Sequence, residues 1–177
     1  MSNIKTSPYM VSPMSRIEIE RYALGLRKLL NLENTLYVDV IRILEFFMII
    51  LDKEFILDIV PDKELDAHAR TYPDQHLIKI RESVYDGARQ GVGRDRLTIM
   101  HEIFHYLKHG KMNISLARNP ESVKAYEDPE WQADAFAGAF LMPSHLIKNM
   151  EVEEIMQKCG VSEAAAKFNL KIAQKKR

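Results

Sequence analysis

Hydrophobic and polar residues alternate along this chain with two different periods, one helical and one extended. Ser15 and Glu18 have the spacing of a capping box, so a helix of about four turns is predicted to begin there. Apolar residues follow at the intervals that place them on one helix face: Ile19, Tyr22, Ala23, Leu26, Leu29 and Leu30. A second helix is predicted from about Asp39. Its apolar face consists of Val40, Ile43, Leu44 and Phe47.

The period shortens to two residues in the middle of the chain. Three segments there predict short strands, at 53–60 (KEFILDIV), 67–72 (AHARTY) and 76–80 (HLIKI). Pro73 and Asp74 are turn-forming residues between the last two segments, which predicts a hairpin. The expected sheet is therefore small, three-stranded and mainly antiparallel.

Helical patterns return after the last of these strands. A short helix is predicted over 83–90, ended by Gly91, and a loop rich in turn residues follows over 91–95. Asp95 is expected to cap the next helix and Gly110 to end it. The loop has two glycines but no following Lys-Ser/Thr pair, so it does not match a phosphate-binding loop.

These elements predict an α+β fold in a single compact domain, with helices surrounding the small sheet. A chain of 177 residues is long enough for one well-buried core and short for two. We expect a loosely ordered N-terminal segment over 1–14, one folded domain over 15–170, and a basic C-terminal tail over 171–177. All of the candidate chemistry lies within the folded domain.

Charge and cysteine content narrow the class of protein further. Lys plus Arg and Asp plus Glu number 25 each, so no large basic surface for nucleic acid or anionic lipid is expected. The longest apolar run, 46–51, is far shorter than the roughly 20 residues of a membrane-spanning helix, and the first residues do not form a secretory signal. Cys159 is the single cysteine, which excludes an intramolecular disulfide and fits a cytoplasmic protein.

One segment, RLTIMHEIFHYLKHG at 96–110, carries residues suited to metal chemistry. His101 and His105 are four residues apart, which on an α-helix places both imidazoles on one side, one turn apart. Two such imidazoles can bind one zinc ion, and a catalytic zinc usually has a third protein ligand and a water. Glu102 is rotated by about 100° from His101, where it can act as a general base on that water.

A third ligand has to come from another element, because short motifs also match by chance and need a confirming context. His109 is excluded as that ligand. It lies eight residues past His101, about 12 Å along the helix axis, so the three histidines cannot converge on one ion. A cationic or capping histidine in the last helical turn is the preferred interpretation of His109.

Residues 126–143 (YEDPEWQADAFAGAFLMP) predict a helix that presents a suitable carboxylate pair. Asp128 is expected at the N-cap and Pro129 in the first turn. Glu130 and Asp134 are four residues apart and share a face. Glu130 can supply the third ligand oxygen, and Asp134 can accept the far ring N–H of a ligand histidine and so fix its tautomer.

HEIFH and EWQADAFAGAFLMP, preceded by VYDGARQGVGRDRLTI, together resemble the ImmA/IrrE-like family of bacterial zinc peptidases. The resemblance covers residues 15–170 and is strongest over 85–143. It implies an α+β domain with the gluzincin arrangement, in which a zincin-like active-site helix bearing His-Glu-x-x-His meets a second helix bearing Glu-x-x-Ala-Asp. The residues it implies for one Zn²⁺ per chain are the ligands His101, His105 and Glu130, the base Glu102 and the supporting carboxylate Asp134.

The resemblance also implies a partner and a location. Members are cytoplasmic, and those studied cleave DNA-binding repressors of mobile elements or stress responses. We therefore expect a protein substrate, a repressor in particular, and neither direct nucleic-acid nor membrane binding; the sequence leaves the oligomeric state open. This chain departs from many relatives in having Phe104 where they have glycine. It also shows no recognition helix of the kind that some relatives carry before the peptidase, so a stand-alone version is expected.

Two other classes of function compete with a peptidase. A regulatory or protein-binding module could use zinc without turnover, but such a site needs no free base, so Glu102 argues against it. A DNA-binding regulator is disfavoured by the zero net charge and the lack of a recognisable reading helix. For a peptidase, Tyr106, Tyr126 and His145 are candidate donors to the oxyanion. Trp131 is expected to pack rather than to touch substrate.

Overall fold

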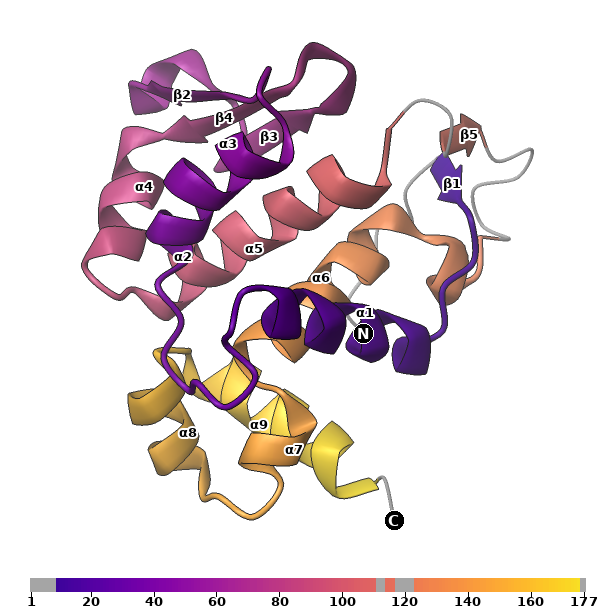
Figure 1. Cartoon of the computed structure of the whole chain (residues 1–177), viewed down its shortest axis with the longest axis vertical. Coiled ribbons are helices and arrows are strands. Elements are labelled where there is room, and N and C mark those ends of the chain that lie inside the picture. Colours follow the sequence, from indigo (N-terminus) through magenta and orange to yellow (C-terminus); the bar gives the residue numbers. More distant parts are fainter. Residues whose placement is uncertain (1–8, 111–113, 117–122, 176–177) are drawn as a thin grey trace.

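The computed structural model describes residues 9–110, 114–116 and 123–175, and their elements surround one long helix, α5 (Figure 1). In chain order the elements are β1 (Tyr9–Val11), α1 (Arg16–Leu29), α2 (Val40–Arg42), the π-helical η1 (Ile43–Phe47), α3 (Met48–Leu51), β2 (Ile56–Val60), η2 (Asp62–Glu64), β3 (Ala69–Tyr72), η3 (Pro73–Gln75), β4 (Leu77–Arg81), α4 (Glu82–Arg89), α5 (Gly93–Lys108), β5 (Ile114–Leu116), η6 (Ala125–Glu127), α6 (Pro129–Leu141), α7 (Ser144–Ile147), α8 (Val152–Cys159) and α9 (Glu163–Lys175). In Figure 1, α5 runs between the three-stranded sheet and the pair formed by α1 and α6, and α7, α8 and α9 lie at the end away from the sheet. The α+β class is confirmed. None of the helices in the described ranges combines the length and the apolar character needed to span a bilayer.

The first predicted helix is confirmed together with its cap. Glu18 N donates to Ser15 Oγ at 3.3 Å, and Ser15 N donates to Glu18 Oε2 at 2.7 Å, which completes the capping box at the start of α1. Leu29, in the last turn of α1, is exposed rather than packed. The helix after Asp39 also begins where predicted, but the π-helical segment η1 separates α2 from α3.

The sheet has the strand order β2-β4-β3 and is mixed. β3 and β4 form the predicted antiparallel hairpin, turned by η3 and by His76, whose φ of 54° is in the left-handed region. β2, however, pairs with β4 in parallel, from Ile56 opposite Leu77 to Val60 opposite Arg81. The expectation of a mainly antiparallel sheet is corrected, because apolar alternation fixes which side chains face the core and not which strand is the neighbour.

α5 begins earlier than predicted. Its N-cap is Val92 and its first residue is Gly93, so Asp95 lies within the first turn at 5% exposure and is not the cap. A Cβ on Gly93 would come within 2.6 Å of Ser162 N in the turn between α8 and α9. Only glycine permits this close approach, which local capping patterns do not reveal. At its other end α5 stops near Gly110, as predicted.

An aromatic cluster holds α1, α5 and α6 together. Phe104 of α5 stacks on Phe136 of α6 with ring centroids 4.7 Å apart, and Tyr22 of α1 lies 6.0 and 5.9 Å from these rings. Both phenylalanines are fully buried. Burying a side chain of this size stabilises the fold by about 1.5–3 kcal/mol. Phe104 is therefore part of the core between the helices.

Two buried guanidinium groups connect helices through main-chain carbonyl groups. Arg27 of α1 donates to Phe140 O at the end of α6 and to Leu32 O, both at 2.6 Å. Arg96 of α5 donates to Gly160 O at the end of α8 at 2.9 Å. Burial lowers the pKa of both side chains, and the carbonyl oxygens offset part of the desolvation. Arg96 consequently contributes to the core and not to a basic surface beside the motif.

Both ends of the described chain contain secondary structure where little was expected. β1 lies within the segment 1–14 and pairs antiparallel with β5, with Tyr9 opposite Leu116. That partner is distant in sequence, so no local pattern indicates it. α9 extends to Lys175 and so includes most of the expected tail, 171–177. It continues because residues at helical spacing bury one face: Ala166, Leu170 and Ala173.

A polar cluster fastens the hairpin turn to α5. Asp52 Oδ2 lies 2.6 Å from His76 Nδ1 and accepts a hydrogen bond from the Tyr106 hydroxyl, while His76 Nε2 lies 3.4 Å from Glu54 Oε2. Hydrogen bonds from Tyr106 and then from His76 lower the pKa of Asp52 to about 2. The hydrogen bond to Asp52 raises the pKa of His76. The cluster is therefore an ion pair over the pH range between these two pKa values.

We expect His76→Asn to lower the free energy of unfolding in a pH-dependent way. The raised His76 pKa gives stabilisation that is complete below about pH 6.5 and lost as the pH rises through the folded value. The lowered Asp52 pKa gives stabilisation that is complete above about pH 4 and lost as the pH falls toward about 2. In urea unfolding, parent and variant should differ more at about pH 5.5 than at about pH 9. Asn tolerates the left-handed backbone, so equal differences at both pH values would rule out the ion pair.

Candidate metal centre

Two helices bring three ligand-type side chains to one point. His101 and His105 lie one turn apart on α5, and their Nε2 atoms are 2.9 Å apart. Glu130, in the first turn of α6, places Oε2 3.2 Å from His101 Nε2 and Oε1 3.4 Å from His105 Nε2. As predicted, α6 begins after Asp128, whose carboxylate accepts from Glu130 N at 2.9 Å. The three side chains form a group that could hold one metal ion.

The spacing of the three ligand atoms suits a tetrahedral ion. Atoms that lie about 2.0–2.1 Å from one ion at tetrahedral angles are roughly 3.3 Å from one another. His105 Nε2 and Glu130 Oε2 lie 2.9 and 3.2 Å from His101 Nε2, which is close to this value, and the other oxygen of Glu130, Oε1, lies 3.4 Å from His105 Nε2. Two imidazoles and one carboxylate are also a donor set of hydrolytic zinc sites, where the fourth position stays open. The residues present therefore fit a zinc ion.

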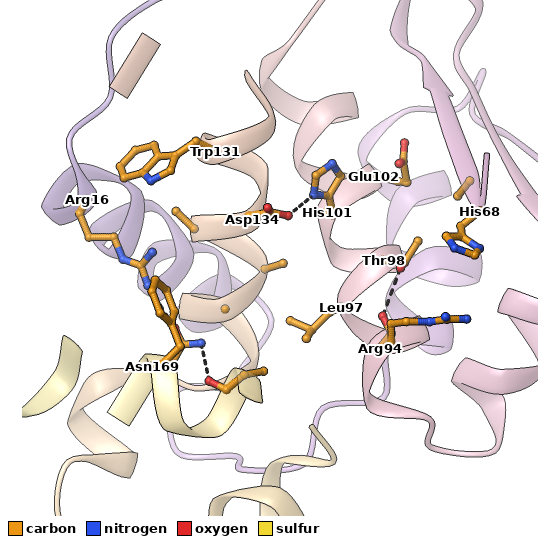
Figure 2. A pocket seen from close by; sticks show the side chains of 16 residues that line it. Arg16, His68, Arg94, Leu97, Thr98, His101, Glu102, Trp131, Asp134 and Asn169 are labelled. Carbon is orange, nitrogen blue, oxygen red and sulfur yellow. Dashed lines mark hydrogen bonds and ion pairs between the residues drawn. The ribbon is translucent and has the colours of Figure 1, made fainter. Parts of the chain in front are cut away.

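Asp134 orients the first histidine. Its Oδ1 lies 2.8 Å from His101 Nδ1 (Figure 2), whereas the ring nitrogen close to Glu130 is Nε2. An ionised carboxylate only accepts hydrogen bonds, so Nδ1 carries the hydrogen. His101 Nε2, which lies beside Glu130, is therefore the ring nitrogen that can bind a metal once it has lost its own proton. Asp134 thus has the geometry for the supporting role that its spacing from Glu130 suggests.

Carboxylates around His101 make the centre attractive to a cation. Burial disfavours the charged ring, but hydrogen bonds to Asp134 and Glu130, and the nearby charges of Asp134 and Glu102, raise the pKa of His101 to about 10. The rings of His101 and then of His105, both close to the Glu130 carboxylate, lower its pKa. A proton supplies the positive charge in the metal-free protein, and a metal cation would take its place.

Glu102 lies beside the ligand group without belonging to it. Its side chain is nearly buried, at 9% exposure, and Thr71 of β3 donates to Oε2 at 2.7 Å. Thr71 Oγ1 also lies 3.0 Å from the main-chain oxygen of Glu102, so this residue connects α5 to the edge of the sheet. The contact holds one carboxylate oxygen and leaves Oε1 available for proton transfer.

Two hollows meet at Glu102. The larger has a volume of about 650 Å³ and is lined by side chains of α5 and α6 that include Leu97 and Trp131 (Figure 2). The smaller has a volume of about 370 Å³, and Thr71 is part of its lining. Glu102 and Ala69 line both. The candidate base, Glu102, therefore lies where the two hollows adjoin.

His109 is buried beyond His105 and does not belong to the ligand group. Its Nδ1 lies 2.8 Å from His105 Nδ1, and its Nε2 lies 3.0 Å from Gln132 Oε1. Gln132 Nε2 donates to Ser12 O at 2.9 Å and to Tyr126 O at 2.8 Å. His109 occupies the C-cap position of α5, which confirms the capping alternative. Burial lowers its pKa to about 4, which argues against the cationic alternative.

The three residues considered as oxyanion donors lie away from the centre. Tyr106 donates to Asp52, and His145 Nε2 lies 3.1 Å from a main-chain carbonyl oxygen between α1 and α2. Tyr126 is partly exposed and, like the other two, lines neither of the two hollows. Trp131 packs partly against the core, as expected, and also lines the larger hollow, where a ligand can reach it.

Thr71 belongs to neither motif, and Gln132 occupies a position that the second motif, Glu-x-x-Ala-Asp, leaves unspecified. Nothing in the strand sequence indicates that β3 passes beside Glu102, so Thr71 follows only from the packing of α5 on the sheet. The position of Gln132 could have been recognised from the sequence. It lies one helical turn before Phe136, on an otherwise apolar face, and a buried amide at such a position needs hydrogen-bond partners.

Comparisons with known proteins find a family and a shared fold. A family model described as the IrrE N-terminal-like domain (Peptidase M78) matches residues 56–171, which is more than half of the chain and includes both motif helices. A solved structure of a Mycobacterium tuberculosis transcriptional regulator has a TM-score of 0.59 at 16% identity, over 90% of this chain and 48% of that one. That likeness shows a shared fold, and this chain spans about half of the regulator's length. No curated protein sequence matches. The chain belongs to the IrrE N-terminal-like family of peptidases, the ImmA/IrrE-like family that its motifs resemble.

Proposed function

We propose that this protein is a zinc-dependent endopeptidase that hydrolyses peptide bonds of another protein. One observation carries the proposal: His101, His105 and Glu130 converge, with one ligand atom from each residue within 4.8 Å of the others, beside the carboxylate of Glu102, which is not a ligand. A structural zinc site would close its fourth position with a protein ligand and would not need a free base. Membership of a peptidase family supports the same conclusion.

The shape of the centre supports an extended peptide as the ligand. β3 is an edge strand of the described sheet, and its residue Ala69 lines both hollows beside Glu102. An exposed strand edge can pair with an extended peptide through main-chain hydrogen bonds. A segment bound along β3 would have residues on both sides of the candidate base. This arrangement suits cleavage within a chain rather than at its end.

The residues of the centre divide the chemical work. A bound zinc ion supplies Lewis acidity, which lowers the pKa of water toward neutrality and polarises a carbonyl group. Glu102 accepts the proton of the attacking water through Oε1 and delivers it to the leaving amine. Thr71 holds Oε2 and so limits rotation of the carboxylate. Asp134 keeps His101 in the tautomer that leaves Nε2 unprotonated.

We further propose that the substrate is a DNA-binding transcriptional repressor of a mobile element or stress response. The resemblance to peptidases that cleave such repressors supports this class, and a solved structure of the same fold is that of a transcriptional regulator. Zero net charge argues against direct contact with nucleic acid. A cytoplasmic location fits the single cysteine, Cys159, which is buried, with its pKa raised to about 11 by burial.

Glu102→Gln should abolish cleavage while leaving about one zinc ion bound per chain. The amide keeps the size of the side chain and an acceptor for Thr71, but it cannot take up the proton of water. We expect cleavage to slow at least 100-fold, the lower end of general acid–base contributions. Zinc content is measured by elemental analysis, and cleavage by mass spectrometry after incubation with repressors encoded near the gene.

Glu153→Gln, an exposed change on α8, is the matched control and should cleave like the parent. Equal cleavage by parent and Glu102→Gln would exclude Glu102 as the base. Zinc in both proteins with cleavage by neither would favour the second candidate, a non-catalytic zinc-containing regulatory or protein-binding module.

Two further substitutions should weaken zinc binding to different degrees. Glu130→Gln replaces an anionic ligand by a neutral amide, so its loss of affinity should be the larger. Asp134→Asn removes only the carboxylate behind His101, and we expect a loss of about 10- to 100-fold. Competition with a chromogenic chelator measures both. If Glu130→Gln binds zinc as tightly as the parent, the third ligand is another residue.

A further inference from the structure

A row of hydrogen bonds runs from two main-chain carbonyl groups through Gln132 and His109 to the ligand histidine His105. We propose that Gln132 and His109 are positioning residues that hold the His105 ring with Nε2 turned toward the metal ion. This inference rests on the metal centre of the proposed function. It assigns a role to the third histidine of the motif segment, which is not a ligand.

Gln132, at the buried end of the row, sets the direction in which the hydrogen bonds are donated. Gln132 is 1% exposed, and its side-chain nitrogen donates to Ser12 O at 2.9 Å and to Tyr126 O at 2.8 Å. Main-chain carbonyl oxygens only accept hydrogen bonds. A flipped Gln132 amide would therefore place its own oxygen against the carbonyl oxygens of Ser12 and Tyr126. Oε1 of Gln132 is therefore the atom that meets His109, and it meets it as an acceptor.

An acceptor at this position decides which ring nitrogen of His109 carries a hydrogen. Nε2 lies 3.0 Å from Gln132 Oε1, so Nε2 is the donor. His109 is 3% exposed and packs edge-on against Phe104, with ring centroids 5.1 Å apart, and such burial favours the neutral ring. In a neutral imidazole that donates from Nε2, Nδ1 is an acceptor.

His105 must then donate from Nδ1. The Nδ1 atoms of His105 and His109 lie 2.8 Å apart, and since His109 accepts, the shared hydrogen belongs to His105. Nε2 of His105 keeps its lone pair, and this atom lies 2.9 Å from His101 Nε2 and 3.4 Å from Glu130 Oε1. The neutral ring of His109 thus orients His105 by accepting a hydrogen bond from Nδ1, as the carboxylate of Asp134 does for His101.

The row also connects His105 to the beginning of the described chain. Ser12 follows β1, and Met14 N donates to Tyr126 O at 2.8 Å, so the segment 12–14, η6 and α6 meet at one hydrogen-bonded corner. This segment precedes residues 56–171, which match the family model. The orientation of His105, which lies inside the matched segment, therefore depends in part on Ser12, which lies outside it.

Two substitutions of His109 separate positioning from packing. His109→Leu fills the buried site with an apolar side chain that offers no acceptor to His105. His109→Asn has a smaller side chain, which places an oxygen near the position of Nδ1. We expect His109→Leu to weaken zinc binding about 10- to 100-fold, and His109→Asn to recover most of that loss. Chelator competition measures zinc affinity, and thermal unfolding of the metal-free proteins measures packing separately.

Nitrogen NMR of the histidine rings gives a second readout that does not depend on activity. In the metal-free parent, His105 should carry its hydrogen on Nδ1. In His109→Leu the hydrogen should shift toward Nε2, because the acceptor at Nδ1 is gone and Glu130 Oε1 still lies 3.4 Å from Nε2. Gln132→Leu should produce the same change without altering any residue that contacts His105.

The outcomes distinguish this inference from the proposed function. If the parent binds zinc and His109→Leu shows the same affinity and the same His105 tautomer, the inference is overturned while the metal centre stands. Equal losses of zinc affinity in His109→Leu and His109→Asn, matched by equal losses of thermal stability, would indicate packing alone and also overturn it. A parent that binds no zinc would overturn both proposals.

Discussion

The packing of α5 against α6 is the contact on which the rest of the structure depends. Phe104 and Phe136 stack at 4.7 Å between ring centroids and are fully buried, and removing a ring of this kind costs about 3–5 kcal/mol. This contact holds the helices at the separation at which Glu130, in the first turn of α6, reaches His101 and His105 on α5. Neither helix needs the other for its own backbone hydrogen bonds, so the candidate metal centre is a product of side-chain packing in the core.

The two ligand histidines are supported by partners of different charge. His101 is oriented by the carboxylate of Asp134, within a group of carboxylates that also includes Glu102 and Glu130. A carboxylate behind His105 would add a further negative charge close to Glu102 and Glu130, and like charges repel. His105 is instead in contact with a buried neutral imidazole. The centre thereby limits the negative charge that one divalent cation has to balance.

Features that depend on a few neighbouring residues could be predicted from the sequence, and features that depend on distant segments could not. The capping box at Ser15, the cap at Asp128 and the two motifs are local, and each has the expected structure. The parallel pairing of β2 and the start of α5 at Gly93 depend on neighbours far along the chain. His109 has one property that could be predicted from the sequence and others that could not. Helical geometry excludes it as a ligand, but its neutral state and its contacts depend on how α6 packs, which the motif does not reveal.

X-ray absorption at the zinc edge, on protein loaded with one zinc ion per chain, tests the central claim most directly. We expect four light-atom ligands at about 2.0–2.1 Å, with the multiple scattering of two imidazole rings and with oxygen atoms in the remaining positions. A third imidazole, a six-coordinate ion or a sulfur ligand would contradict a centre built from His101, His105 and Glu130 with one open position.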